Sequence, residues 1–187
     1  MNYLNLPVGV SNFEKLRSEG YYYVDKTGLI ADILHTKAEV MLITRPRRFG
    51  KTLGMSMLEN FFDIRRDSRA LFEGLEIAGD QALCDVWMNR YPTIFVSFRQ
   101  VDGLDFTGAY DMLTWVISEL YKEHRYLLDS DRIGTSDKEI AKQLEWGQAS
   151  LKDTKGSLLL LTRMMQQHYG KPVILLIDEY DVPVAKA

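Results

Sequence analysis

The sequence predicts an α/β fold in which helices cover both faces of a parallel sheet. Three stretches are apolar almost throughout and suit buried strands: 39–44, 93–98 and 173–177. Between them lie segments with apolar residues at helical spacing, including 105–128 and 157–168. Strands that are buried on both faces are apolar along their whole length, and their alternation with helices is typical of a three-layer arrangement.

The composition is that of a globular domain. Of 187 residues, 46% are hydrophobic and 26% are charged, and no apolar run approaches the roughly 18 residues of a membrane helix. A formal net charge of −3 argues against nucleic-acid binding through a broad basic face. The single cysteine, Cys84, excludes an internal disulfide, and no secretory signal opens the chain. We therefore expect a cytoplasmic protein without a membrane partner.

The first 36 residues predict a helical and extended segment that packs on the core, while 37–187 form the main domain. Ser11–Glu14 has capping-box spacing and predicts a short helix ending at Gly20. The aromatic run 21–24 favours extended structure, and Thr27 can cap a helix whose apolar positions continue to residue 34.

The order of the remaining elements follows from periodicity and breakers. Strand 39–44 is followed by a loop and by a helix with one apolar face formed by Leu53, Met57, Leu58, Phe61 and Phe62. Strand 93–98 precedes the long helix 105–128, and a second capping box at 136–139 predicts a more polar helix. Helix 157–168 ends before Gly170, and the last strand, 173–177, ends in Asp178-Glu179.

The first motif that suggests chemistry is Gly50-Lys51-Thr52, which lies between a predicted strand and a predicted helix. Backbone N–H groups at a helix N-terminus point toward an anion, and the helix dipole favours negative charge there. Gly50 would let the backbone approach a phosphate, Lys51 would reach the β- and γ-phosphates, and the Thr52 hydroxyl would bind Mg²⁺.

This loop departs from the usual phosphate-binding pattern, which requires a glycine where the chain has Arg45. Pro46 partly compensates because its ring fixes φ. By itself the tripeptide fits an ordinary helix start equally well. The candidate nucleotide-binding residues are Arg45, Pro46, Arg47, Arg48, Phe49, Gly50, Lys51, Thr52 and Leu53.

The second motif is the apolar run 175–177 followed by Asp178-Glu179, the pattern called Walker B. Ligands of open α/β sheets bind outside the C-terminal ends of the strands. Asp178 would hold Mg²⁺, and Glu179 would orient and polarise the attacking water. A strand that runs into an acidic turn is the structural alternative. The pair of motifs, with strand 93–98 between them and a glutamate after the aspartate, favours the hydrolytic branch of P-loop proteins.

The landmarks together resemble a known family. Leu6–Val10, Tyr22–Thr27, Arg45–Thr52 and Asp178–Asp181 look like those of bacterial predicted AAA-ATPase-like proteins, and the resemblance covers nearly the whole chain. The family usually has arginine at the position of Arg45, so the missing glycine need not inactivate the site. The resemblance implies a P-loop ATPase core that is followed by a C-terminal domain similar to restriction-type nucleases.

This resemblance implies a sheet of five strands, of which the sequence predicts three. We therefore expect an incomplete P-loop domain that lacks the strands and lid after Walker B. An uncovered sheet edge would favour self-association. Nucleic acid would be a partner only through a domain that this chain does not contain.

The leading hypothesis is an ATPase core that hydrolyses MgATP, with catalytic residues Lys51 and Glu179 and with Thr52 and Asp178 as metal ligands. One alternative is a nucleotide-dependent switch that binds ATP without appreciable hydrolysis. Another is phosphoryl transfer to a small molecule, which Glu179 argues against. The hypothesis requires Lys51 and the acidic pair to act around one triphosphate.

Two further groups stay open between a functional and a structural role. Arg45, Arg47 and Arg48 would either contact phosphate oxygens, in their own subunit or a neighbouring one, or form a solvated basic turn. The tyrosines at 21–23 would either stack on an adenine or, as we favour, pack on the sheet edge.

Overall fold

The chain forms two compact units, Met1–Thr93 and Ile94–Ala187, which we call the N-terminal and C-terminal units. The computed structural model describes residues 5–36, 38–44, 49–101 and 105–181. These residues are mostly helical, with one two-stranded sheet, so the predicted α/β class is confirmed at this coarse level. The predicted division between residues 36 and 37 stays a prediction.

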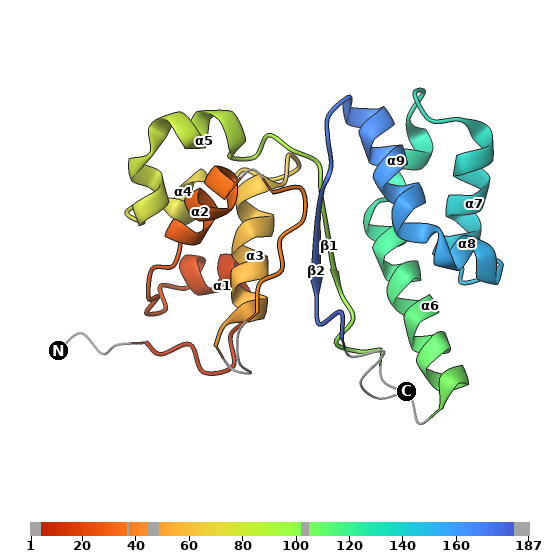
Figure 1. Cartoon of the computed structure of the whole chain (residues 1–187), viewed down its shortest axis with the longest axis horizontal. Helices are drawn as coiled ribbons and strands as arrows, with labels where there is room; N and C mark the ends of the chain where they lie inside the picture. Colours follow the sequence, from red (N-terminus) through yellow and green to blue (C-terminus); the bar gives the residue numbers. More distant parts are fainter. Residues whose placement is uncertain (1–4, 37, 45–48, 102–104, 182–187) are drawn as a thin grey trace. The chain divides into compact units, whose positions relative to one another are not determined.

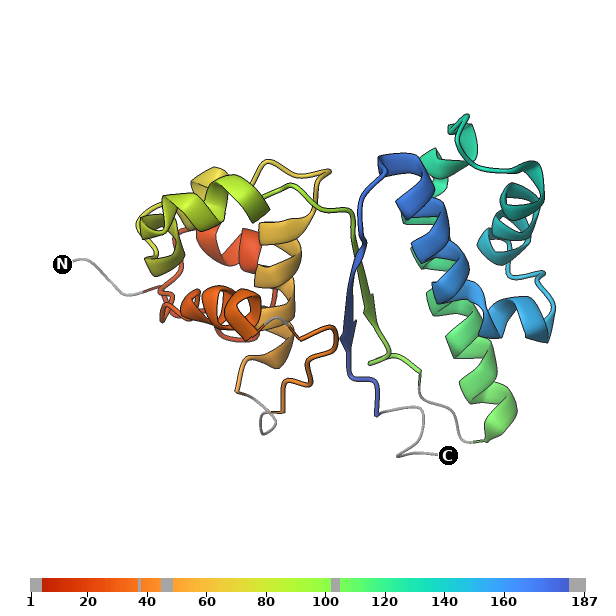
Figure 2. The same ribbon diagram turned by 45° about the horizontal axis from the view of Figure 1, so that its top comes forward.

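The described part of the N-terminal unit is built from helices and loops, and the other helices gather around α3 (Figure 1, Figure 2). The side chain of Asn12 accepts a hydrogen bond from the Lys15 N–H and so caps the first helix. The helical elements are α1 (Phe13–Ser18), α2 (Gly28–Thr36), α3 (Lys51–Phe62), α4 (Arg69–Phe72), η1 (Glu76–Gly79) and α5 (Gln81–Trp87).

An aromatic cluster forms the core of this unit. Phe72 packs against Phe13 and Phe61, with ring centroids 5.0 and 5.4 Å apart, and all three side chains are fully buried. The buried Ser56 hydroxyl accepts a hydrogen bond of 3.1 Å from the Phe13 N–H, which joins α1 to α3. The predicted apolar face of α3 is thus confirmed as the core-forming face.

The predicted strand at 39–44 is not formed. Residues 41–44 carry no regular structure, and Val40 and Leu42 are 88% and 63% exposed. An apolar sequence becomes a strand only where a neighbouring strand supplies backbone hydrogen bonds. The described remainder of the N-terminal unit is helical or irregular and offers no strand to pair with.

The C-terminal unit contains the sheet. Its elements are β1 (Thr93–Ser97), α6 (Phe106–Glu123), η2 (Arg125–Asp129), α7 (Thr135–Glu145), α8 (Leu151–Lys155), α9 (Ser157–Tyr169) and β2 (Ile174–Asp178). β1 and β2 are neighbours that run in the same direction, and the helices of this unit lie on one side of them (Figure 1). The predicted strands at 93–98 and 173–177 are confirmed within one residue.

The core of the C-terminal unit lies between the strands and the helices α6, α7 and α9. Its buried side chains include Ile94 from β1, Leu120 from α6, Leu144 from α7, and Leu161 and Met165 from α9. The Tyr121 hydroxyl donates a hydrogen bond of 2.8 Å to the Ser157 carbonyl, and burial raises the pKa of this phenol. The predicted long helix ends at Glu123, and a 3-10 turn (η2) follows it.

Among the described residues, no helix combines the length and the apolar character that crossing a bilayer requires.

Candidate functional site

Gly50 and α3 form the first half of the candidate site. Gly50 precedes the helix with φ 75° and ψ 28°, a left-handed conformation that glycine adopts without a steric penalty. The Gly54 N–H donates a hydrogen bond of 2.9 Å to the Gly50 carbonyl, so the regular helix begins at once after this residue. The helix predicted after Gly50 is confirmed, whereas the strand predicted before this loop is not formed.

The first turn of α3 favours an anion. It contains Lys51 and Thr52 and no acidic residue, although aspartate and glutamate are the residues that usually complement a helix N-terminus. Gly50 has no side chain that could accept hydrogen bonds from the first backbone N–H groups of the helix. These N–H groups and the Lys51 ammonium therefore give the N-terminal end of α3 its positive charge. Phe49, before the turn, is exposed. Arg45, Pro46, Arg47 and Arg48 lie outside the described residues.

The acidic pair forms the second half of the candidate site. Asp178 is the last residue of β2 and is 2% exposed, and its carbonyl accepts a hydrogen bond of 3.0 Å from the Phe98 N–H. Glu179 follows with φ 53°, a left-handed conformation that is uncommon for a residue with a Cβ. Such backbone strain is concentrated at functional sites, because the surrounding structure must hold it.

The two halves belong to different units. The structure brings Gly50, Lys51, Thr52 and Leu53 together at the start of α3 in the N-terminal unit, and Asp178 and Glu179 together at the end of β2 in the C-terminal unit. Their action on one triphosphate stays a prediction. No group of three or more metal-ligating side chains occurs among the described residues.

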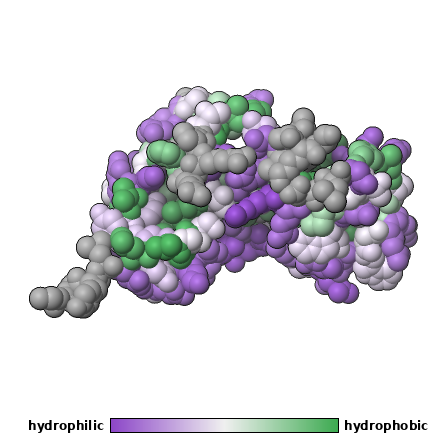
Figure 3. Space-filling view, turned by 90° about the horizontal axis from the view of Figure 1, so that it is seen from below, coloured by the Kyte–Doolittle hydropathy of each residue, from purple (hydrophilic) through white to green (hydrophobic). Residues whose placement is uncertain are grey.

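A cavity of about 300 Å³ lies beside the start of α3. One wall is a stripe of α3 formed by Gly50, Leu53, Gly54 and Met57. The facing wall comes from the N-terminal part of the chain, above all from Tyr22, Tyr23, Val24, Lys26 and Leu29. Figure 3 shows apolar surface gathering on the side of the N-terminal unit that is seen from below. A hollow with mostly apolar walls is typical of a small-molecule site.

Asp25 fixes the segment that forms this facing wall. Its carboxylate accepts hydrogen bonds from the Thr27 N–H (2.8 Å), the Thr27 hydroxyl (2.7 Å) and the Glu76 N–H (2.7 Å). Burial alone would raise the pKa of Asp25, but these donors stabilise the carboxylate and lower the pKa. The Thr27 hydroxyl in turn accepts from the Ile77 N–H. The Asp25-Lys26-Thr27 landmark therefore joins the segment to η1.

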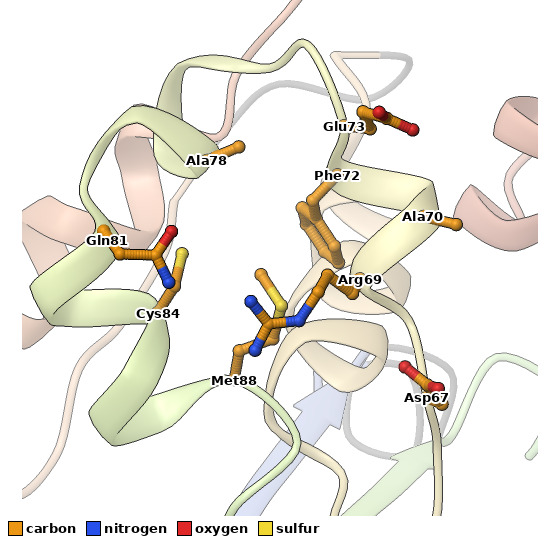
Figure 4. Close-up of a pocket in the computed structure, with 9 residues that line it drawn as sticks. All are labelled: Asp67, Arg69, Ala70, Phe72, Glu73, Ala78, Gln81, Cys84 and Met88. Carbon is orange, nitrogen blue, oxygen red and sulfur yellow. The ribbon is translucent and has the colours of Figure 1, made fainter.

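A second cavity, of about 610 Å³, lies between α4 and α5 (Figure 4). Its lining includes Arg69, Phe72, Cys84 and Met88, and it contains none of the predicted site residues. The buried Cys84 thiol donates to the Ile77 carbonyl over 3.3 Å, and burial raises its pKa. A raised pKa favours the protonated thiol, which is a weaker nucleophile than the thiolate.

Comparison with known proteins identifies the family of the chain. Residues 7–187 match the family described as "Predicted AAA-ATPase" (AAA-ATPase_like), and the chain belongs to this family. The chain is also 29% identical over 185 residues to an "Uncharacterized protein in vnfD 5'region" of Azotobacter chroococcum mcd 1. That alignment covers 98% of this chain and 30% of the relative. No solved structure matches the chain.

Sequence reasoning missed one part of the site, the hollow formed at Gly54. A glycine inside an amphipathic helix was the available signal, because it costs about 1 kcal/mol relative to alanine and usually has a packing or functional reason. The tyrosine run was the other signal. Tyr22 and Tyr23 line the hollow, and their packing on a sheet edge stays a prediction.

Proposed function

We propose that the chain is the nucleotide-binding core of an ATPase. The observation that carries this proposal is the left-handed Gly50 followed by a helix whose first turn contains Lys51 and Thr52 and no acidic residue. This combination suits the β- and γ-phosphates of a nucleotide. Membership of the family of predicted AAA-ATPases supports the same class of function.

In this proposal each half of the site has its own task. Backbone N–H groups at Gly50 and the Lys51 ammonium stabilise the charge that develops on the phosphates during transfer. The Thr52 hydroxyl and the Asp178 carboxylate would hold Mg²⁺, which neutralises phosphate charge when it is bound. Arginines of the loop 45–48 would add positive charge at the phosphates.

Glu179 acts on the water in the proposed reaction. It orients a water molecule for in-line attack on the γ-phosphorus, and the bond from phosphorus to the bridging oxygen of ADP breaks. The proton of the water passes to the carboxylate. The left-handed backbone at Glu179, φ 53°, supports this assignment because such strain is concentrated at functional sites.

The proposal includes the fold of the domain, in which β1 and β2 would belong to a three-layer P-loop sheet with helices on both faces.

Two substitutions test the roles. We expect Lys51→Ala to abolish ATP binding, measured by calorimetry, because the phosphates lose their main positive charge. We expect Glu179→Gln to retain binding and to lower phosphate release by at least about 100-fold, since the amide cannot accept the proton. Lys155→Ala and Glu139→Gln, at exposed positions of α8 and α7, are matched controls. Turnover that survives in Glu179→Gln would contradict the role of this residue.

A nucleotide-dependent switch is the second candidate. It has the same phosphate-binding features at Gly50 and Lys51, and the chain spans about 30% of the length of its relative. This candidate predicts tight ATP binding without steady-state phosphate release in the wild type. The same two measurements therefore distinguish the candidates.

A further inference from the structure

The hollow beside α3 results from the absence of a side chain at Gly54. Gly50, Leu53, Gly54 and Met57 follow the spacing of one helix face, and all of them line the cavity. Leu58 and Phe61 lie toward the aromatic core instead, and both are buried. The glycines at 50 and 54 therefore leave the N-terminal half of this stripe open.

The described structure does not require glycine at position 54. Its φ is not in the left-handed region, and a Cβ built there meets no described heavy atom within 4 Å. A glycine inside a helix is nevertheless about fivefold less favourable than alanine for helix formation at that position, taking the upper end of the usual range. A ligand that fills the space would account for a glycine at this position.

The facing wall is suited to a flat ring. Tyr22 lines the cavity with 51% of its surface exposed, so its ring can still be covered by a ligand. Two contacts fix the position of the Tyr23 side chain. Its hydroxyl donates a hydrogen bond to the Met57 sulfur over 3.4 Å, and its ring makes a T-shaped contact with the ring of Phe13. The Tyr22 N–H donates to the Asn5 carbonyl over 2.8 Å, which anchors the segment.

We infer that this cavity binds the base of a nucleotide by stacking and apolar packing, without hydrogen-bond recognition of the base edge. The inference rests on the proposed function, because the phosphates would lie at Gly50 and Lys51, where the cavity begins. Among the described lining residues, only Tyr22, Tyr23 and Lys26 have polar side-chain ends, and the Tyr23 hydroxyl is already bonded.

This lining determines the expected specificity. A site rejects an analogue strongly when it contains buried polar groups that pair with the correct ligand, and apolar walls discriminate only weakly. Every base offers a flat face for stacking. ATP and GTP should therefore bind within about tenfold of each other. CTP and UTP should bind more weakly than both, because a single ring buries less apolar surface.

Filling the cavity gives the sharpest test. Calorimetry with Mg²⁺ compares ATP, GTP and tripolyphosphate on the whole chain and on Gly54→Leu. We expect the variant to lose at least about tenfold in affinity for ATP and GTP and to keep its affinity for tripolyphosphate. Gly79→Leu, an exposed glycine where a Cβ also meets no described atom, is the matched control. The thermal midpoint of Gly54→Leu should not fall, since leucine favours a helix.

Tyr22 provides an independent variant. Tyr22→Ala should weaken ATP binding about 5- to 100-fold, the usual effect of removing one base-stacking ring, while Tyr22→Phe keeps the ring and the affinity. Neither change should alter tripolyphosphate binding.

The outcomes separate this inference from the proposed function. A wild type that binds neither ATP nor tripolyphosphate would contradict both. ATP binding that is unchanged in Gly54→Leu and in Tyr22→Ala would contradict the base site alone. A preference of 100-fold or more for one purine nucleotide would contradict recognition by apolar packing.

Discussion

At the scale of single residues, local hydrogen bonds decide how the candidate site is held. Asp25 accepts three hydrogen bonds and joins the cavity wall to η1, although the residue itself is exposed. The sequence predicted that a helix starts at Thr27, and α2 begins at the next residue, Gly28. The bond to the Glu76 N–H was not predictable, because it joins residues 51 positions apart.

Substitution of Asp25 tests whether these three hydrogen bonds stabilise the folded protein. We expect Asp25→Ala to lower the free energy of unfolding at neutral pH by about 1–2 kcal/mol, as for other lost capping carboxylates. The folded state lowers the pKa of Asp25, so its stabilisation is present above the unfolded pKa and is lost as pH falls through the folded pKa. The difference from wild type should therefore shrink below about pH 4.

Denaturant titrations between pH 3 and 7, followed by circular dichroism, measure this difference. Asp32→Ala, at an exposed position of α2, is the control and should show no such loss. The difference in the free energy of unfolding between Asp25→Ala and wild type could also be constant across this range. That result would contradict stabilisation by the Asp25 carboxylate.

At the scale of elements, the helices were predictable and one strand was not. Apolar spacing located α3, α6 and α9, because a helix satisfies its own backbone hydrogen bonds and needs only one covered face. A strand depends on a neighbour, and segment 39–44 has none among the described elements of its unit. The short elements α4, η1, α5 and α8 were not predicted, because so few residues carry no clear period.

Two leucines of α9 test which face of this helix forms the core. Leu161 is fully buried, whereas Leu159 is 72% exposed. We expect Leu161→Ala to lower the free energy of unfolding by about 2–5 kcal/mol, because the cavity that it leaves is only partly filled by relaxation. Leu159→Ala on the same helix should change it by less than about 0.5 kcal/mol. Equal effects in denaturant titrations would contradict the assigned face.

At the scale of the whole molecule, one segment exposes several neighbouring apolar side chains, which is rare on protein surfaces. Val40, Met41 and Leu42 are consecutive and exposed, in the segment where a sheet strand was expected. Exposed apolar stretches of this kind promote association, particularly where backbone groups can pair with a second chain. The predicted self-association stays a proposal, with this segment as its contact.

Sedimentation velocity across a wide concentration range tests the proposal. We expect the wild type to form dimers or larger species at high concentration, and we expect the double substitution Val40→Lys and Leu42→Lys to remain monomeric. The apparent affinity should fall at least about tenfold, because charges at such an edge oppose strand pairing. Val86→Lys, at an exposed apolar position of α5, is the control. Wild type that is monomeric at every concentration would contradict the proposal.

The sequence by itself determined the α/β class, the long helices, the helix that follows Gly50 and the position of the acidic pair at the end of β2. These features depend on local periodicity and on residue chemistry over a few positions, which the order of residues records directly. Tertiary structure alone decided that segment 39–44 stays unpaired, that Asp25 joins residues 25–27 to η1, and that Gly54 and Tyr22 enclose one cavity. Each of these depends on which distant segments meet, and packing rather than local preference selects those contacts.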